Sequence, residues 1–248
     1  MQLDLWLQWY DKVRAKFGYS VVEDQSSAQL LSELLEGRAV DLNRVKELIT
    51  GKNVIVIGAG PSLEDGIDAI KNLKSFVIIA ADGASEALIE NNIKPDIVVT
   101  DLDGSHEHLL KADKMGSVMV VHAHGDNVNL LRNLVPKMKN LMGTTQVKPL
   151  HNIHNFGGFT DGDRAVFLAS EFGAKNIVLI GMDFGDKIGK YSKTKVKDEK
   201  LKIAKMEIGK ELLEWLATFS RAKLYNTSPN TIRGFKNIAL NEIGIMMG

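Results

Sequence analysis

The sequence of 248 residues contains no cysteine, which excludes disulfide bonds, thiolate metal sites and cysteine nucleophiles. It also carries no net charge, with 31 basic and 31 acidic residues, whereas proteins that bind nucleic acids or membrane surfaces usually present a basic face. No apolar run is long enough to span a bilayer, and the N-terminus MQLDLWLQWYDKVRAKFG lacks the pattern of a signal peptide. We therefore expect a cytoplasmic protein that binds neither nucleic acid nor membrane.

Short apolar runs do occur, and they alternate with helical segments. The runs predict strands at residues 53–58, 75–82, 96–101, 117–124 and 176–183. Helices are expected between most of them, at about 62–72, 84–91, 126–134 and 161–172. Continuous Val and Ile runs separated by helices are typical of strands buried on both faces. The sequence thus predicts an α/β fold, a Rossmann-like, mostly parallel sheet with flanking helices, whose strand order it does not define.

Three segments are expected along the chain. Residues 1–50 show helical spacing of leucines and aromatics and form an N-terminal helical segment, and residues 51–185 form the Rossmann-like core. Residues 186–248 open with a stretch of seven lysines, DKIGKYSKTKVKDEKLK, and continue as a helix at about 198–219 and a strand at 222–228. The lysine-rich stretch is either a solvated loop or a lid over a triphosphate.

Carboxylates follow two neighbouring strands. The strand in IVVTDLDGS ends in Asp101 and Asp103, and the preceding strand ends in Asp82 and Gly83. Three carboxylates at one edge of a sheet would repel one another without a cation, and hard oxygen ligands at this density suit Mg²⁺. The alternatives are a turn at Asp103 and a helix cap at Asp82. Asp183 ends a further strand and belongs to the same edge.

A glycine turn in VIVIGAGPSLEDG leads from a strand into a helix. Gly58 and Gly60 permit close backbone approach, Pro61 adjoins the cap, and Ser62 has capping-box spacing with Asp65. The dinucleotide fingerprint fails, because a leucine stands where the third glycine belongs, and a Walker A motif is missing. The turn is either a tight structural connection or a phosphate contact through helix N–H groups.

Two further stretches contain polar side chains. In NFGGFTDGDRA, Gly158 lies in a glycine loop, Thr160 begins a helix whose first turn is acidic, and Arg164 is either a phosphate contact or a solvated residue. In HAHGDN, His122, His124 and Asp126 cluster at a strand end. They are polar active-site residues, zinc ligands or incidental neighbours.

These motifs resemble known families. ADGASEALIENNIKPDIVVTDLDGS and FTDGDRAVFLASEFGAKNIVLIGMDFGD resemble thiamine pyrophosphokinase catalytic domains over about 50–185, although Gly104 stands between Asp103 and Ser105. Across the whole chain, GAGPSLE, DLDG, HAHGDN, GGFTDGDRA and GMDFG resemble the archaeal 6-hydroxymethyl-7,8-dihydropterin pyrophosphokinases. The same superfamily includes motility-accessory proteins linked to flagellar sugar modification, which share the GxGPSL element.

The resemblance implies an enzyme that uses ATP and Mg²⁺ to place a pyrophosphate on the pterin hydroxymethyl group and releases AMP. It implies catalytic roles for Asp101, Asp103 and Asp161 and metal binding by Asp82, Asp101 and Asp103. The remaining strand-end residues would contact nucleotide or pterin: Gly58, Gly60, Pro61, Ser62, Asp82, Gly83, His122, His124, Asp126, Gly158, Thr160 and Asp183. A homodimer follows the habit of the family. A thiamine pyrophosphokinase-like enzyme, a sugar-nucleotide transferase or accessory protein, and a non-catalytic nucleotide-binding module remain open.

Overall fold

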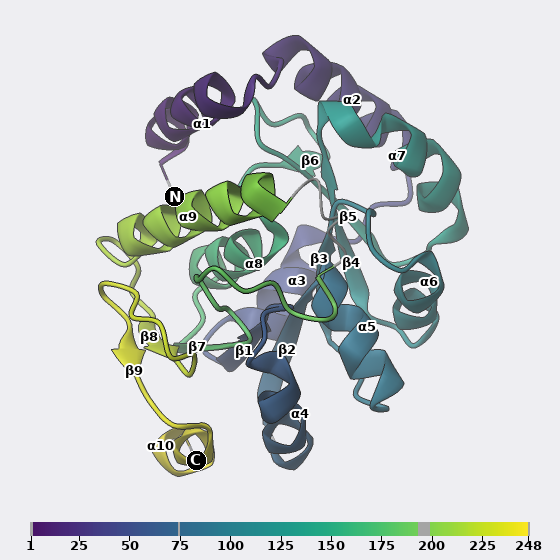
Figure 1. Cartoon of the computed structure of the whole chain (residues 1–248). Helices are drawn as coiled ribbons and strands as arrows, with labels where there is room; N and C mark the ends of the chain where they lie inside the picture. The colour runs from purple at the N-terminus through teal and green to yellow at the C-terminus, as the bar shows by residue number, and fades with distance from the viewer. Residues whose placement is uncertain (1, 74, 193–198, 248) are drawn as a thin grey trace.

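A nine-stranded parallel sheet forms the centre of the molecule in the computed structural model, which describes residues 2–73, 75–192 and 199–247 (Figure 1). Its strand order is β6-β5-β4-β3-β2-β1-β7-β8-β9, and every pairing between named strands is parallel. The strands are β1 (Asn53–Ile57), β2 (Phe76–Ala81), β3 (Ile97–Thr100), β4 (Val118–Ala123), β5 (Leu141–Thr145), β6 (Ile153–His154), β7 (Asn176–Ile180), β8 (Lys223–Asn226) and β9 (Lys236–Asn237).

Helices precede the sheet, connect its strands and close the chain (Figure 1). They are α1 (Leu3–Phe17), α2 (Val21–Leu34), α3 (Leu42–Ile49), α4 (Leu63–Asn72), α5 (Asp82–Glu90), α6 (His106–Lys114), α7 (Val128–Leu134), α8 (Asp161–Glu171), α9 (Glu199–Leu216) and α10 (Ile243–Met247), with 3₁₀ turns η1 (Gly125–Asn127), η2 (Val135–Lys137) and η4 (Leu240–Glu242). None of the described helices has both the length and the apolarity that a membrane-spanning segment requires.

The central strands are buried on both faces, as their uninterrupted Val and Ile runs predict. In β1, Val54 and Val56 belong to the larger core, which includes residues of α1, α2, α8 and α9. Ile55 and Ile57 alternate with them and belong to a second core with α4, α5 and α10. The predicted α/β architecture is therefore confirmed, with helices on both faces of the sheet.

Several elements were missing from the sequence prediction, and their composition explains why. β5 reads LMGTT and β6 is only two residues long, so neither forms a continuous Val/Ile run. α6 reads HEHLLKADK, in which polar residues outnumber the apolar ones that define helical spacing. β5 and β6 extend one side of the sheet, so the sheet has more strands than the sequence predicts.

The order in which the chain adds strands to the sheet reverses at β1. The chain adds β2 to β6 on one side, then returns to place β7 on the other side of β1. In open parallel sheets, ligands bind beyond the carboxyl ends of the strands at such a switch point. The fold therefore directs attention to the loops that follow β1, β2, β3 and β7.

Candidate active site

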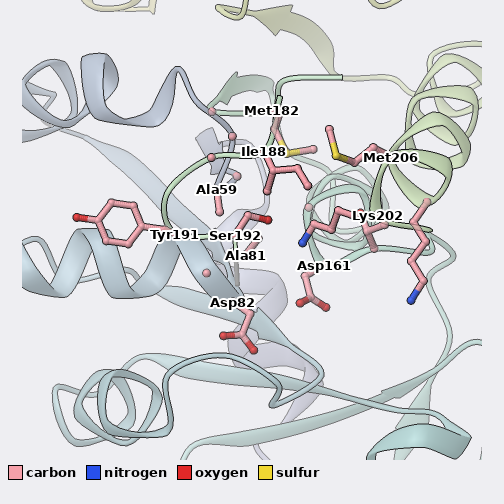
Figure 2. Close-up of a pocket in the computed structure, with 18 of the residues that line it drawn as sticks. Ala59, Ala81, Asp82, Asp161, Met182, Ile188, Tyr191, Ser192, Lys202 and Met206 are labelled. Atoms are coloured by element: carbon pink, nitrogen blue, oxygen red, sulfur yellow. The ribbon is translucent and has the colours of Figure 1, made fainter. Parts of the chain in front are cut away.

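A cavity of about 410 Å³ lies at this switch point (Figure 2). Residues after β1, β2, β3 and β7 line one part of it, and the start of α8, the segment 187–192 and the first turns of α9 line the rest. In Figure 2, Asp82 and Asp161 lie below the segment that carries Ile188, Tyr191 and Ser192. Of the residues expected to form the site, this cavity is lined by Gly58, Gly60, Asp82, Gly83, Asp101, Asp103, Thr160, Asp161 and Asp183.

Asp82 is a buried carboxylate at the start of α5, with 4% of its surface exposed. Its Oδ2 accepts a hydrogen bond from the Thr100 hydroxyl and a second from the Gly104 N–H at 3.2 Å. Its Oδ1 is buried and has no hydrogen-bond partner among the described residues. A Cβ at position 104 would overlap this oxygen, so the glycine that distinguishes DLDGS from the thiamine pyrophosphokinase pattern makes room for Asp82.

The turn after β3 holds Asp101 and Asp103 close together. Leu102 between them adopts a φ of 72°, a left-handed conformation that is costly for leucine, and its N–H donates to Thr100 Oγ1 at 2.8 Å. The Asp103 N–H donates to Asp101 Oδ1 at 3.2 Å. Asn127 Nδ2 donates to the Asp101 carbonyl at 2.8 Å, which fixes the turn to the end of β4.

The carboxylates perturb one another. Burial raises the pKa of Asp82 to about 7, and the charges of Asp101 and Asp103 add to the shift. Burial and the neighbouring Asp101 charge raise the pKa of Asp103 to about 6. Burial also acts to raise the pKa of Asp101, but the hydrogen bond with His124 and the charges of His124 and Arg164 outweigh it and hold that pKa below its usual range. Crowded carboxylates of this kind favour a bound cation.

Asp161 and Arg164 extend the cluster from the first turn of α8. Burial, and then the charge of Asp101, raises the pKa of Asp161 well above its usual value. Its Oδ1 lacks a hydrogen-bond partner among the described residues, although Arg164 Nη1 lies 3.5 Å away. Asp163, by contrast, is a capping residue, because it accepts hydrogen bonds from the Phe159 and Thr160 N–H groups.

A divalent cation fits this donor set. One carboxylate oxygen each from Asp82, Asp101 and Asp103 lies within 4.8 Å of the other two. The unpaired Asp82 oxygen and the raised pKa values are the features that a bound cation would relieve, and Mg²⁺ prefers such hard oxygen ligands. Among the described residues, Asp82, Asp101 and Asp103 form the group of side chains close enough together to hold a metal ion. This group contains no histidine, so the zinc interpretation receives no support.

The glycine turn after β1 is packed rather than open. The Gly58 and Gly60 N–H groups donate to the Ile180 and Gly181 carbonyls at 2.9 and 2.8 Å, and a Cβ on either glycine would collide with the chain after β7. Asp183 Oδ2 accepts hydrogen bonds from Ser62 N and Ser62 Oγ at 2.9 and 2.8 Å. The predicted capping box with Asp65 is wrong, because Ser62 makes no side-chain cap and Asp183 occupies the N-terminus of α4 instead.

The remaining expected residues lie outside the cavity lining. Neither Pro61 nor Ser62 lines it, and Asp126 is exposed in η1. His122 is buried against Thr144, with 3.1 Å between Nδ1 and Oγ1, and burial lowers its pKa well below the usual value. His124 Nε2 lies 3.4 Å from Asp101 Oδ2 and so acts on the site through that carboxylate. Gly158 has a φ of 87° and packs against the Arg164 backbone.

Comparison with known proteins identifies the family of this chain. A family model described as 6-hydroxymethylpterin diphosphokinase MptE-like matches residues 28–189. A 6-hydroxymethyl-7,8-dihydropterin pyrophosphokinase from Methanocaldococcus jannaschii is 42% identical over 231 residues, which cover 87% of this chain and 96% of that protein. The protein of the same description from Pyrococcus furiosus is 45% identical over 233 residues, 92% of this chain and 100% of its own. This chain belongs to that family.

Family membership confirms the resemblance found in the motifs. A solved structure, the Maf glycosyltransferase from Magnetospirillum magneticum AMB-1, shares the fold with a TM-score of 0.55 and 18% identity, covering 86% of this chain and 39% of that one. At this identity the likeness concerns the fold alone.

Part of the cavity wall lies beyond the residues that the MptE-like model matches. Lys202, Lys205 and Met206 reach the cavity from α9 (Figure 2 labels Lys202 and Met206), whereas Lys187, which also lines the cavity, lies within the matched segment. The sequence analysis placed Lys187 and Lys202 in the lysine-rich stretch that is either a solvated loop or a lid over a triphosphate. It missed Lys205 and Met206, although lysines three apart on one helix face were a signal for this wall. The expected lid is partly described: residues 187–192 border the cavity, and residues 193–198 lie outside the described chain.

Proposed function

We propose that this chain transfers a pyrophosphoryl group from ATP to the hydroxymethyl group of 6-hydroxymethyl-7,8-dihydropterin, with Mg²⁺, and releases AMP. The observation that carries the proposal is the cavity, in a chain of the MptE-like family, where buried carboxylates with unpaired oxygens face lysines. The curated relatives are named for this pyrophosphokinase activity. We also propose a cytoplasmic location and assembly as a homodimer.

In this proposal the reaction is an in-line displacement. The pterin hydroxymethyl oxygen attacks the β-phosphorus of ATP, the bond from that phosphorus to the α,β-bridging oxygen breaks, and AMP leaves with that oxygen. The hydroxyl proton goes to solvent. Because such a transition state demands little covalent participation from the protein, positioning and charge neutralisation supply most of the rate enhancement.

The proposed roles follow from position. Asp82, Asp101 and Asp103 would hold Mg²⁺, which when bound would neutralise phosphate charge. Lys187, Lys202 and Lys205 would contact phosphate oxygens from the opposite wall, and Arg164 would add a guanidinium from a largely buried position beside Asp161. Segment 187–192 would limit access of water, since Gly189 packs on Ala59 and Gly60.

The test is AMP release from ATP and Mg²⁺, measured in parallel with 6-hydroxymethyl-7,8-dihydropterin, with thiamine and with no acceptor. We expect AMP only with the pterin, together with pterin diphosphate in equal amount by mass spectrometry. AMP only with thiamine would retain the mechanism and replace the acceptor. Nucleotide binding without AMP from either acceptor would contradict the proposal and favour a sugar-nucleotide transferase or a binding module.

A further inference from the structure

Asp24 on α2 is a buried carboxylate that lies outside the cavity lining, and only 3% of it is exposed. Three neutral donors satisfy it: Tyr10 Oη at 2.5 Å and Gln146 Nε2 at 2.6 Å donate to Oδ2, and Gly125 N donates to Oδ1 at 2.7 Å. Because a carboxylate only accepts, each of these donors has a fixed direction. Two of these donors, Gln146 and Gly125, connect Asp24 to residues of the candidate active site, and each connection is called a branch below.

The first branch runs through Gln146 to Arg164. The Gln146 amide turns its NH₂ group to Asp24, so its Oε1 faces away and accepts a hydrogen bond from Arg164 Nη2 at 3.0 Å. Trp6 Nε1 donates to the Gln146 carbonyl at 2.8 Å and secures the backbone there. Arg164 then lines the cavity, with Nη1 3.5 Å from Asp161 Oδ1.

The second branch runs through Gly125 to Asp101. Gly125 directly follows His124, whose Nε2 lies 3.4 Å from Asp101 Oδ2. The same short turn carries Asn127, which donates to the Asp101 carbonyl at 2.8 Å. Through the Gly125 N–H, Asp24 therefore fixes a turn that contacts Asp101 twice.

We propose that Asp24 is a positioning residue, which orients Arg164 on one side of the cavity and the His124–Asp101 pair on the other. The proposal rests on the proposed function, because it assigns these groups to nucleotide and metal binding. Residue 24 precedes the segment 28–189 that the family model matches, so only the structure connects it to the site. Mutation of a residue that lies outside a site and orients its charged groups typically lowers metal affinity or activity by 10- to 100-fold.

Asp24→Asn tests this, because an amide cannot satisfy both branches. If the asparagine oxygen accepts from Gln146, its NH₂ group faces the Gly125 N–H. If the oxygen accepts from Gly125, the asparagine NH₂ group faces the Gln146 NH₂ group. Rotation of the Gln146 amide would relieve this clash of donors, but it would turn the Gln146 NH₂ group toward Arg164, which is itself a donor. We expect kcat to fall by about 10- to 100-fold. We also expect weaker Mn²⁺ binding in the presence of ATP, followed by electron paramagnetic resonance.

The double variant Asp24→Asn with Gln146→Glu is the rescue. Glutamate at 146 accepts from both Arg164 and the new amide, whose oxygen then accepts from Gly125, and the buried charge is conserved. We expect kcat and Mn²⁺ binding to return to within about threefold of the parent. Should Asp24→Asn not fold, Gln146→Leu breaks only the Arg164 branch and is measured in the same way.

Asp113→Asn is the matched control. Asp113 is equally buried, at 4% exposure, and accepts from the Lys139 and Asn140 N–H groups, remote from the cavity. We expect it to lower the midpoint of thermal unfolding and leave kcat and Mn²⁺ binding unchanged. Unchanged kcat and Mn²⁺ binding in Asp24→Asn, or equal losses in both variants, would overturn the inference. If the parent releases no AMP, the proposed function fails, and Mn²⁺–ATP binding across the same variants still decides the role of Asp24.

Discussion

Two carboxylates at strand ends, Asp82 after β2 and Asp183 after β7, look alike in the sequence and differ in the folded protein. Both line the cavity. Asp183 Oδ2 accepts two hydrogen bonds from Ser62 at the start of α4. Asp82 keeps one buried oxygen without a hydrogen-bond partner in the described chain, and burial raises its pKa to about 7.

Asp183 thus has a structural role at the start of α4, whereas Asp82 has an oxygen that is available to bind a ligand. A carboxylate at a helix N-terminus stabilises that helix. A buried carboxylate oxygen without a hydrogen-bond partner, such as Asp82 Oδ1, costs free energy, which a protein tolerates where a cation or substrate completes the site. The glycine turn next to Asp183 also has a structural role, since the N–H groups of Gly58 and Gly60 are bonded to the chain after β7.

Asp101→Asn tests the group of carboxylates to which Asp82 belongs, and it gives the largest expected effect. Removal of one carboxylate from the Asp82, Asp101 and Asp103 group removes a metal ligand, and we expect Mg²⁺-dependent AMP release to fall by about 1,000-fold, or about 4 kcal/mol. The measurement is kcat over a Mg²⁺ titration, with circular dichroism to show an intact fold. Retained activity in this folded variant would refute the metal assignment.

Gly104→Ala tests the space around Asp82 without altering a charge. The added Cβ would overlap Asp82 Oδ1, so the carboxylate or the turn must move. We expect a loss of about 1–3 kcal/mol in the free energy of unfolding and a fall of about 100-fold in kcat. Gly116→Ala is the control, because its Cβ would meet open space, although its φ of 91° adds a backbone strain that position 104 does not have. Equal kcat in both variants would show that the position of Asp82 does not matter.

The pH dependence of stability tests the ionisation of Asp82. Its folded pKa, about 7, exceeds the unfolded value near 3.9, so the folded state holds the proton more tightly. This contribution is fully present below about pH 4 and is lost as pH rises through 7; we expect stability in EDTA to fall by about 3 kcal/mol over that range. Asp82→Asn should remove this contribution, leave those of Asp103 and Asp161, whose pKa values are also raised, and abolish stabilisation by Mg²⁺, as chemical denaturation would show. A profile unchanged by Asp82→Asn would contradict the raised pKa.

The fold and the acidic edge were largely predictable, because both depend on local pattern. The apolar runs predicted β1 to β4 and β7, and Asp82, Asp101 and Asp103 lie together because the carboxyl ends of parallel strands meet at one edge of the sheet. Lys205 was not found, and Lys202 was placed only in a stretch that is either a solvated loop or a lid, since the approach of both lysines depends on a crossover between β7 and β8 whose path the sequence does not specify. The role of Ser62 was likewise hidden, because its partner Asp183 is 121 residues away.

Ser62→Ala gives the smallest expected effect and tests the structural side of the comparison. It removes the hydroxyl that donates to Asp183 Oδ2 at 2.8 Å and leaves the backbone N–H that donates to the same oxygen. We expect a loss of about 1 kcal/mol in the free energy of unfolding and less than a twofold change in the KM for ATP. Urea unfolding and initial rates over an ATP titration measure the two quantities. A large rise in the KM for ATP with unchanged stability would mean that Ser62 binds nucleotide, and would place the Asp183 side of the cavity in the same class as Asp82.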